Sequence, residues 1–221
     1  MKTFETNLFD RINRIDMIYR HFKRHQFTIL LFLLTFVITS CSVRSVQIKR
    51  AEQRYQKGQY LASKGDVDRA IMNFNKSISM ARGAEYMAGV ANNLNELAII
   101  YTTRGEYEKA RALLDEMIAI YKDLNMEPEV SKTMNNLALT YVREKEFQEA
   151  FKWFDELMAW DKKTGNELGI GITLYNMALI YHQHLGMTDK GKECMYQALR
   201  IFKETGNEEY IRMIQEKTQK K

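Results

Sequence analysis

Residues 135–159 read NNLALTYVREKEFQEAFKWFDELMA, and the pattern they contain occurs four times along the chain. Apolar and small residues recur at intervals of three and four on both sides of a short charged turn, which predicts two helices. Their small residues, Ala138 and Ala150, have counterparts at spacings of 40 or 41 residues. The first-helix set is Gly58, Ala98, Ala138 and Ala178, and the second-helix set is Ala70, Ala110, Ala150 and Gly191. A fixed period between 20 and 50 residues is typical of a solenoid.

The residue types within this period have a physical reason. Two antiparallel helices can approach closely only if the side chain at their crossing is small, and large residues one turn away fill the remaining space. Those large residues are Tyr101, Tyr141, Tyr181, Phe74, Leu114, Phe154 and Met195. Glycine stands in three of the four turns, at Gly65, Gly105 and Gly186, where a helix end favours a positive φ. Lys145 stands in the other turn, which we expect to differ or to be slightly strained.

The pattern resembles the tetratricopeptide repeat over about residues 51–207. The segments that carry the resemblance are LAIIYTTRGEYEKARALLDEM (97–117), LALTYVREKEFQEAFKWFDEL (137–157) and MALIYHQHLGMTDKGKECMYQA (177–198). Two features depart from the family: its first-helix tryptophan is Leu94, Met134 or Leu174 here, and Pro128 is the only proline. The period of about 40 is similar to that of the long-helix repeats of kinesin light chains and bacterial regulators.

The resemblance implies an all-α fold, a right-handed α-solenoid of about four long helical hairpins. We expect the repeats to occupy residues 51–84, 85–125, 129–166 and 167–207. Residues 208–221 have an apolar face formed by Tyr210, Ile211, Met213 and Ile214, which predicts a C-terminal capping helix. Gly165 and Gly206 precede Asn166 and Asn207, a helix stop followed by a candidate N-cap.

The N-terminal segment reads as an export signal. Residues 27–38, FTILLFLLTFVI, are uncharged and follow Arg20, Lys23 and Arg24. Twelve apolar residues are short for a spanning helix, which needs about 20. The sequence ITSC at 38–41 resembles a bacterial lipobox, which implies cleavage after residue 40 and a covalent lipid on Cys41. We hypothesise that Met17 is the true start, because a signal beginning there has an ordinary length.

An uncleaved anchor is the alternative to lipidation. In either case residues 41–50 would be a lipidated or anchored end followed by a short polar tether, which reaches roughly 30 Å when extended. Ser42, which follows the cysteine, is compatible with sorting to the outer membrane, so we expect a lipoprotein there that faces the periplasm.

Composition argues against several other functions. The formal charge is +5, but residues 41–221 carry 27 basic and 25 acidic side chains. The charge of this part of the chain is therefore nearly balanced and does not predict binding to nucleic acid. Cys41 and Cys194 are too few for a disulfide framework and lack metal-ligand spacing. We therefore expect no metal, no cofactor beyond the lipid on Cys41, and no enzymatic activity.

The resemblance places a partner-binding groove on the first helices of the repeats. Family positions about two and three before the small residue, and four after it, face that groove, and we add the next residues Arg143 and Gln183. Here they give Asn95, Glu96, Thr102, Asn135, Asn136, Val142, Arg143, Tyr175, Asn176, His182 and Gln183. A side-chain amide both donates and accepts, so it can pair with the backbone of an extended peptide. The alternative is that these asparagines bridge neighbouring repeats.

We interpret the chain as a membrane-tethered scaffold or adaptor of the bacterial cell envelope, which binds a protein or peptide partner. The alternative is a peptide-sensing module that controls an effector protein. A third option is a structural scaffold built by stacking copies of the chain end to end. The choice among scaffold functions rests on analogy of fold.

Overall fold

The computed structural model describes residues 42–219, with side chains described as far as Glu216. Cys41, Met17 and the predicted export signal lie outside these residues. The chain divides into two units, Met1–Arg50 and Ala51–Lys221, and the repeats make up the second unit. Between residues 42 and 219, helices and short turns account for the whole chain, which confirms the all-α class. None of the helices in that range is long and apolar enough to span a membrane.

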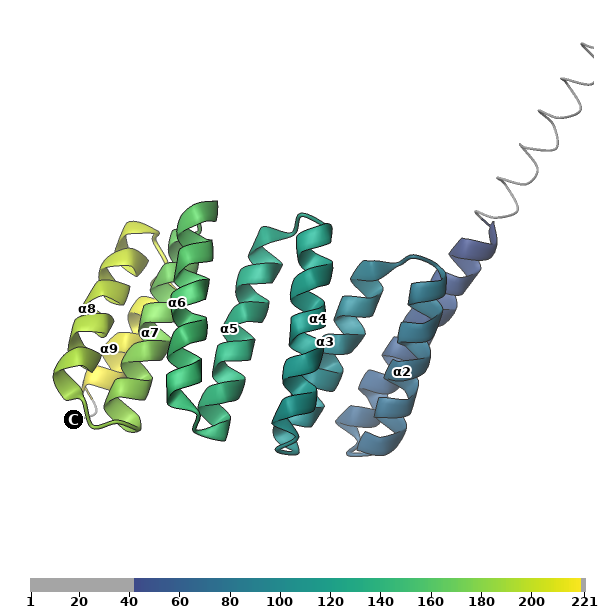
Figure 1. Ribbon diagram of the computed structural model, residues 1–221, viewed down its shortest axis with the longest axis horizontal. Helices are drawn as coiled ribbons and strands as arrows, with labels where there is room; N and C mark the ends of the chain where they lie inside the picture. Colours follow the sequence, from purple (N-terminus) through teal and green to yellow (C-terminus); the bar gives the residue numbers. More distant parts are fainter. Residues whose placement is uncertain (1–41, 220–221) are drawn as a thin grey trace, which may run out of the picture. The chain divides into compact units, whose positions relative to one another are not determined.

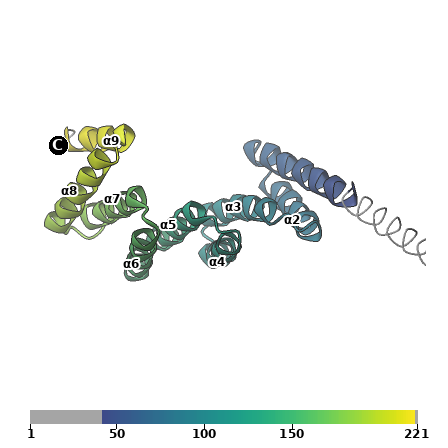
Figure 2. The ribbon, with the colours of Figure 1, turned by 90° about the horizontal axis from the view of Figure 1, so that it is seen from above.

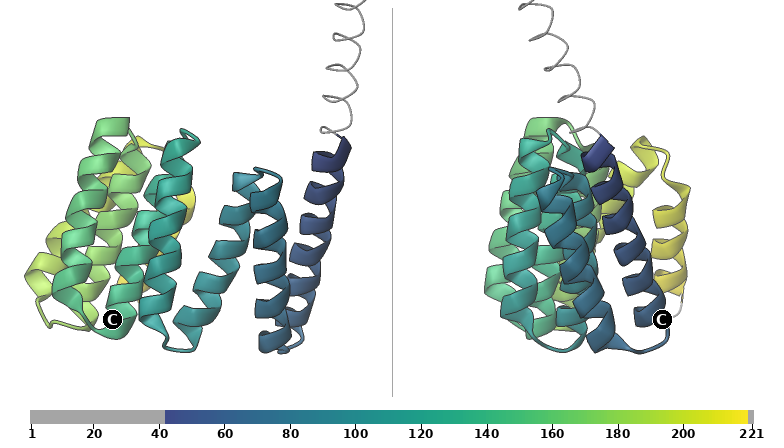
Figure 3. Two further views of the ribbon diagram at one scale, coloured as in Figure 1. Left: turned by 45° about the vertical axis from the view of Figure 1, so that its right-hand side comes forward. Right: turned by 90° about the vertical axis from the view of Figure 1, so that its right-hand side faces the viewer.

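Each repeat is a pair of helices joined by a tight turn (Figure 1). Residues 42–63 are helical and precede α2. The labelled helices are α2 (Val67–Gly83), α3 (Met87–Thr103), α4 (Tyr107–Asp123), α5 (Glu127–Glu144), α6 (Phe147–Thr164), α7 (Glu167–Gln183), α8 (Thr188–Glu204) and α9 (Glu208–Gln219). The hairpins are therefore α3–α4, α5–α6 and α7–α8, preceded by the hairpin that α2 closes. The turns gather at the two ends of these helices (Figure 3).

The first and second helices of the repeats lie on different sides of the row. In Figure 2, α4 and α6 lie on one side of α3 and α5. We call the surface formed by the exposed side chains of α3, α5 and α7 the first-helix face. It is the surface on which the sequence predicts partner binding.

The predicted helix crossings hold in the structure. All eight small residues of the two repeated sets are buried. A Cβ added to Gly58 would lie 2.6 Å from the Phe74 ring, and one added to Gly191 would lie 3.2 Å from the Ala178 carbonyl oxygen. Real Cβ atoms do not tolerate the first distance, so the hairpin closed by α2 requires glycine there. Larger side chains at these crossings would force the helices apart.

A left-handed residue recurs after each described helix that is followed by another helix, at steps of 20 or 21 residues. The set is Gly65, Glu85, Gly105, Asn125, Lys145, Gly165, Gly186 and Gly206. The following residue closes the turn by donating its N–H to a carbonyl of the last helical turn. Glu146 N donates to Tyr141 O at 2.9 Å, and Asn166 N donates to Asp161 O at 2.8 Å. This is the Schellman arrangement. The turn at Lys145 thus has the same geometry as the glycine turns, with φ 68° and ψ 18°.

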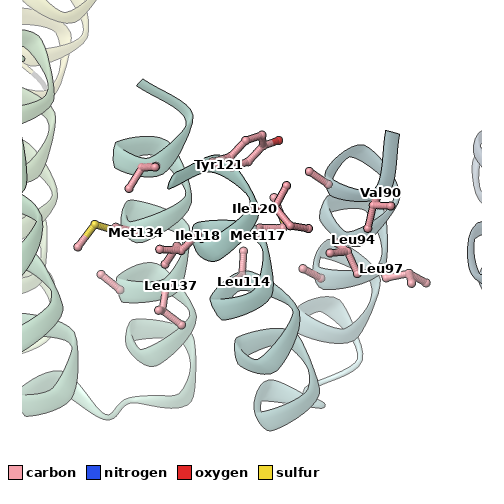
Figure 4. Packing of buried hydrophobic residues seen from close by; sticks show 14 of the residues in the cluster. Val90, Leu94, Leu97, Leu114, Met117, Ile118, Ile120, Tyr121, Met134 and Leu137 are labelled. Atoms are coloured by element: carbon pink, nitrogen blue, oxygen red, sulfur yellow. The ribbon is translucent and has the colours of Figure 1, made fainter. Parts of the chain in front are cut away.

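The core forms two apolar clusters. Figure 4 shows part of the first, where Leu94 and Leu97 of α3, Leu114 of α4 and Leu137 of α5 pack together. The second surrounds Phe202 of α8 and includes Ile214 of α9. Helix α9 therefore lies where the sequence predicts a capping helix.

Helix α9 is held by aromatic and cap contacts at its start. Its Tyr210 ring stacks on Phe202 at 4.6 Å between centroids. The Tyr210 N–H also donates to Asn207 Oδ1 at 3.3 Å, in the manner expected of an N-cap. Ile214, one turn further along, is 2% exposed.

A buried carboxyl group joins repeats three and four. Asp161, at the end of α6, is fully buried, and its Oδ1 accepts from Asn166 Nδ2 at 2.9 Å. Asn166 caps α7 by accepting from Gly169 N, as its predicted role requires, and its Nδ2 also reaches Ser131 Oγ of α5 at 3.1 Å. A Cβ on Gly169 would lie 2.3 Å from Asp161 Oδ2. Burial raises the pKa of Asp161, and hydrogen bonds from Ser131 and Asn166 oppose that rise without cancelling it.

The structure gives a conformation to residues 42–50, for which the sequence predicts a short polar tether. Residues 42–50 are helical. A helix advances about 1.5 Å per residue, so these nine residues reach about 14 Å instead of the roughly 30 Å of an extended chain. The apolar side chains Val43 and Val46 are exposed on this helix.

Replacing Lys145 by glycine should stabilise the protein. A left-handed conformation costs a non-glycine residue about 1–2 kcal/mol, whereas glycine adopts it freely. We expect Lys145→Gly to raise the free energy of unfolding by about 1 kcal/mol, measured by urea denaturation. Lys76→Gly is the matched control, because Lys76 is exposed inside α2. It should lower stability by about 1 kcal/mol, and a similar loss for Lys145→Gly would contradict the prediction.

The Asp161 carboxyl group should make stability fall as pH rises. A carboxyl group with a raised pKa in the folded state stays protonated there after the unfolded chain has ionised, at about 3.9. Its contribution is therefore favourable below that pH and is lost as the pH rises through the folded pKa. We expect Asp161→Asn to be more stable than the natural chain at pH 7, with a difference that shrinks toward pH 3.5.

Thermal unfolding of both proteins across this pH range measures the difference. Asp155→Asn is the control for loss of a carboxylate, since Asp155 is exposed on the same helix. A stability difference for Asp161→Asn that does not change with pH would show that burial of the charge is not the cause.

Candidate partner-binding site

A hollow on the first-helix face lies between α3 and α5. It has a volume of about 250 Å³ and opens between the first helices of repeats two and three. Its lining residues are Asn95, Ala98, Ile99, Thr102, Thr103, Leu114, Asn136, Leu139, Thr140 and Arg143. Nine of these ten belong to α3 or α5, and Leu114 of α4 forms the floor from the core side. We call this hollow the α3–α5 pocket.

Four of the predicted groove residues line this pocket: Asn95, Thr102, Asn136 and Arg143. Within the described part of the chain, the amide groups of Asn95 and Asn136 make no hydrogen bond, so both remain able to donate and accept. Thr102 Oγ1 donates to Ala98 O at 2.7 Å, and Thr140 Oγ1 donates to Asn136 O at 2.8 Å. Each hydroxyl group donates its hydrogen within its own helix. The two threonine side chains therefore offer a partner only an oxygen acceptor and a methyl group.

Three other predicted residues bridge neighbouring repeats. Asn176 Nδ2 of α7 donates to Asn135 Oδ1 of α5 at 2.8 Å. Glu96 Oε1 accepts from Tyr55 Oη at 3.1 Å and from Gln59 Nε2 at 2.8 Å, both on the helix before α2. Burial and the neighbouring Glu96 charge raise the pKa of Tyr55 to about 12, so its hydroxyl stays a donor. These residues therefore make hydrogen bonds between neighbouring repeats, which is the alternative to a peptide-binding role.

The remaining predicted residues lie outside the pocket. Tyr175 is 4% exposed, with its ring 5.9 Å from that of Tyr210 on α9, so it does not belong to an exposed groove. His182 and Gln183 are exposed at the end of α7. Val142 is half-buried against the core. The capping helix thus covers Tyr175, and the prediction that Tyr175 faces an exposed groove is wrong.

The sequence interpretation missed an aliphatic row on the first-helix face. Ile99, Leu139 and Leu179 directly follow the small residue of the first helix in repeats two, three and four, at intervals of 40. Ile99 is 55% exposed, and both Ile99 and Leu139 line the α3–α5 pocket. Leu139 and Leu179 are half-buried, and each packs against a core cluster. The repeat period itself could have identified these residues. An aliphatic residue recurs at the position after the small residue, which does not belong to the core-facing side of the helix.

Arg143 supplies the charge of this pocket. The carboxylate of the next residue, Glu144, already pairs with Arg111. Arg111 also lies over the Tyr141 ring at 4.6 Å from its centroid, which fixes its position. The Arg143 carbonyl accepts from Tyr107 Oη at 3.4 Å, but its guanidinium group forms no ion pair among the described residues. The pocket therefore combines free amides, an aliphatic wall and one cation.

No metal site is formed in the part of the chain that the structure describes. Cys194 is half-buried among core residues, and burial raises the pKa of its thiol. His184 stacks on Phe147, with 5.2 Å between the ring centroids. The chemistry gathered on the first-helix face is that of polypeptide recognition: amides for a backbone and an apolar surface for side chains.

Comparison with known proteins gives a family and a fold. A family model of the tetratricopeptide repeat matches residues 50–123 and 129–204, more than half of the chain. The crystal structure of aspartyl phosphate phosphatase F from Bacillus subtilis matches with a TM-score of 0.65 and 14% identity, over 76% of this chain and 44% of that one. A second crystal structure, of the nearly identical TPR-like repeats of a kinesin light chain from Podosopora anserina, matches with a TM-score of 0.58 and 19% identity.

The second match covers 76% of this chain and 86% of the fungal repeat protein. At these identities the likeness shows the fold alone. The chain spans less than half of the phosphatase, so the activity of that protein says nothing about this one. A search of curated proteins returned no match to this chain.

Proposed function

The chain belongs to the tetratricopeptide repeat family, and from that premise we propose that it is a membrane-tethered scaffold of a bacterial cell envelope. In this proposal the first-helix face binds a segment of a partner protein, and the N-terminus holds the repeats at the membrane. Repeats of this family build protein-binding surfaces, and the stacked hairpins here have the same arrangement. Binding rather than catalysis is the function we assign.

The α3–α5 pocket is the observation that carries the binding part of the proposal. Stacking of helical hairpins satisfies the side chains between repeats, as the Asn135–Asn176 hydrogen bond illustrates. The amides of Asn95 and Asn136 lack such partners within the described residues and line an open hollow. Asparagine is a poor helix former, so two unpaired copies on a helix surface favour a role in binding.

The tether is supported by the sequence alone. The basic residues before an uncharged run at 27–38, followed by ITSC at 38–41, favour export and attachment of lipid to Cys41. Each buried CH₂ contributes about 0.8 kcal/mol to membrane binding, so several acyl chains on one cysteine would hold firmly. With residues 42–50 helical, a mature chain starting at Cys41 would keep its first repeat close to the membrane surface.

Replacement of Cys41 tests the tether. In cells, Cys41→Ser should move the protein from the membrane fraction to the soluble fraction, or block its processing. Mass spectrometry of the natural protein should find an acylated N-terminal Cys41. Cys194→Ser is the control, because Cys194 lies half-buried in the last repeat. A mature chain that retains residues 27–38, or that starts beyond Cys41 without lipid, would overturn the lipidated form of the proposal.

Site-specific crosslinking tests the binding face. A photoreactive amino acid at position 95 of the full chain, in the native cell, should give a crosslinked product of defined mass. The same amino acid at position 76, exposed on the second helix of repeat one, is the matched control. Equal products from both positions, or none from position 95, would contradict binding on the first-helix face.

A further inference from the structure

We propose that the α3–α5 pocket selects a partner segment that carries a large aliphatic side chain within two residues of a carboxylate. The aliphatic group lies between Ile99 and Leu139, and the carboxylate pairs with Arg143. This inference rests on the proposed function, because it specifies what the first-helix face binds.

The aliphatic row provides the anchor point. Ile99 exposes 55% of its surface, and Leu139 lies across the pocket from it. Leu139 and Leu179 are both half-buried, each against a core cluster, so Ile99 is the exposed residue of the row. Burying one Leu or Ile side chain gains about 1.5–3 kcal/mol, a factor of about 10–150 in affinity. An aliphatic side chain from a partner therefore finds the exposed residue of this row, Ile99, in the α3–α5 pocket.

The charge of the pocket sets the second requirement. Arg143 is the charged member of the ten lining residues, and its guanidinium group has no ion-pair partner among the described residues. Glu144, the next residue along α5, is already paired with Arg111. A partner carboxylate would meet an uncompensated positive group, whereas a lysine or arginine at the same place would be repelled.

The length of the pocket fixes how far apart the two groups are. Asn136 and Arg143 stand seven residues apart on α5, about 10 Å along a helix axis, and Leu139 lies between them. An extended segment advances about 3.3 Å per residue, so about three of its residues lie along this distance. With its backbone on the Asn95 and Asn136 amides, its aliphatic side chain meets Ile99 and Leu139. The carboxylate then follows one or two residues later.

Selection from a random library of displayed twelve-residue peptides tests the inference. The full chain should enrich peptides with Leu, Ile or Val next to, or two residues from, Asp or Glu. The same selection is run on Ile99→Ser and Arg143→Gln. Met72→Ser and Lys76→Gln are the matched controls, because both residues are exposed on α2 and lie away from the pocket.

Synthetic copies of an enriched peptide then give the magnitudes. Ile99→Ser should weaken binding about 10-fold, from the lost apolar contact. Arg143→Gln should weaken it about 3-fold, as expected of an exposed ion pair, and should abolish the preference for Asp over Asn in the peptide. Arg143→Glu should restore binding to a peptide whose acidic residue is replaced by lysine. The control variants should bind as the natural chain does.

Two different failures are distinguishable. Peptides that are enriched without the aliphatic–acidic pair, yet lose binding when Asn95 and Asn136 are both replaced by alanine, would overturn this inference and leave the proposed function standing. A library that yields no binder, or only binders insensitive to every replacement on the first-helix face, would overturn both. Thermal unfolding of each variant by circular dichroism verifies that it is folded.

Discussion

The whole structure depends on the close approach of two helices at a small residue. At Gly58 even one added carbon would lie 2.6 Å from the Phe74 ring, and at Gly191 it would lie 3.2 Å from a backbone carbonyl oxygen. Close approach sets each hairpin, and hairpins of equal length stack with the period of 40 or 41 residues seen in the sequence. Because the crossings use one side of every first helix, its opposite side can face solvent wherever no other contact covers it.

The fold could be predicted from the sequence because its constraints are local and repeated. The small residues, the aromatic residues one turn away and the glycine turns are all visible as residue types. The turns at Glu85, Asn125 and Lys145 were less visible, since their side chains do not require the left-handed conformation they adopt. Geometry imposes it instead: each helix must reverse within about three residues, and the Schellman hydrogen bonds need a positive φ whatever residue is present.

The site could be predicted only in part, because membership of a face does not determine what a side chain contacts. Family positions place Asn95, Asn135, Asn136 and Asn176 on one surface, but only the structure shows that Asn135 and Asn176 bond to each other. Tyr175 was misplaced because the capping helix, which comes much later in the chain, packs over it. Ile99 and Leu139 were passed over because an aliphatic residue in a helical repeat is usually part of the core.

The same packing that stabilises the last repeat leaves the open part of the first-helix face in the middle of the row. The buried Asp161–Asn166–Ser131 contacts, the Asn135–Asn176 hydrogen bond and the stacking of Tyr210 on Phe202 all lie at or beyond the junction of repeats three and four. These contacts pair polar groups and bury apolar side chains that would otherwise face solvent. Between α3 and α5 no such contacts close the surface in the described chain, and two amides, two aliphatic side chains and one guanidinium group remain available there. A partner that used the whole length of the face would have to displace contacts already made, whereas one that used this pocket would not.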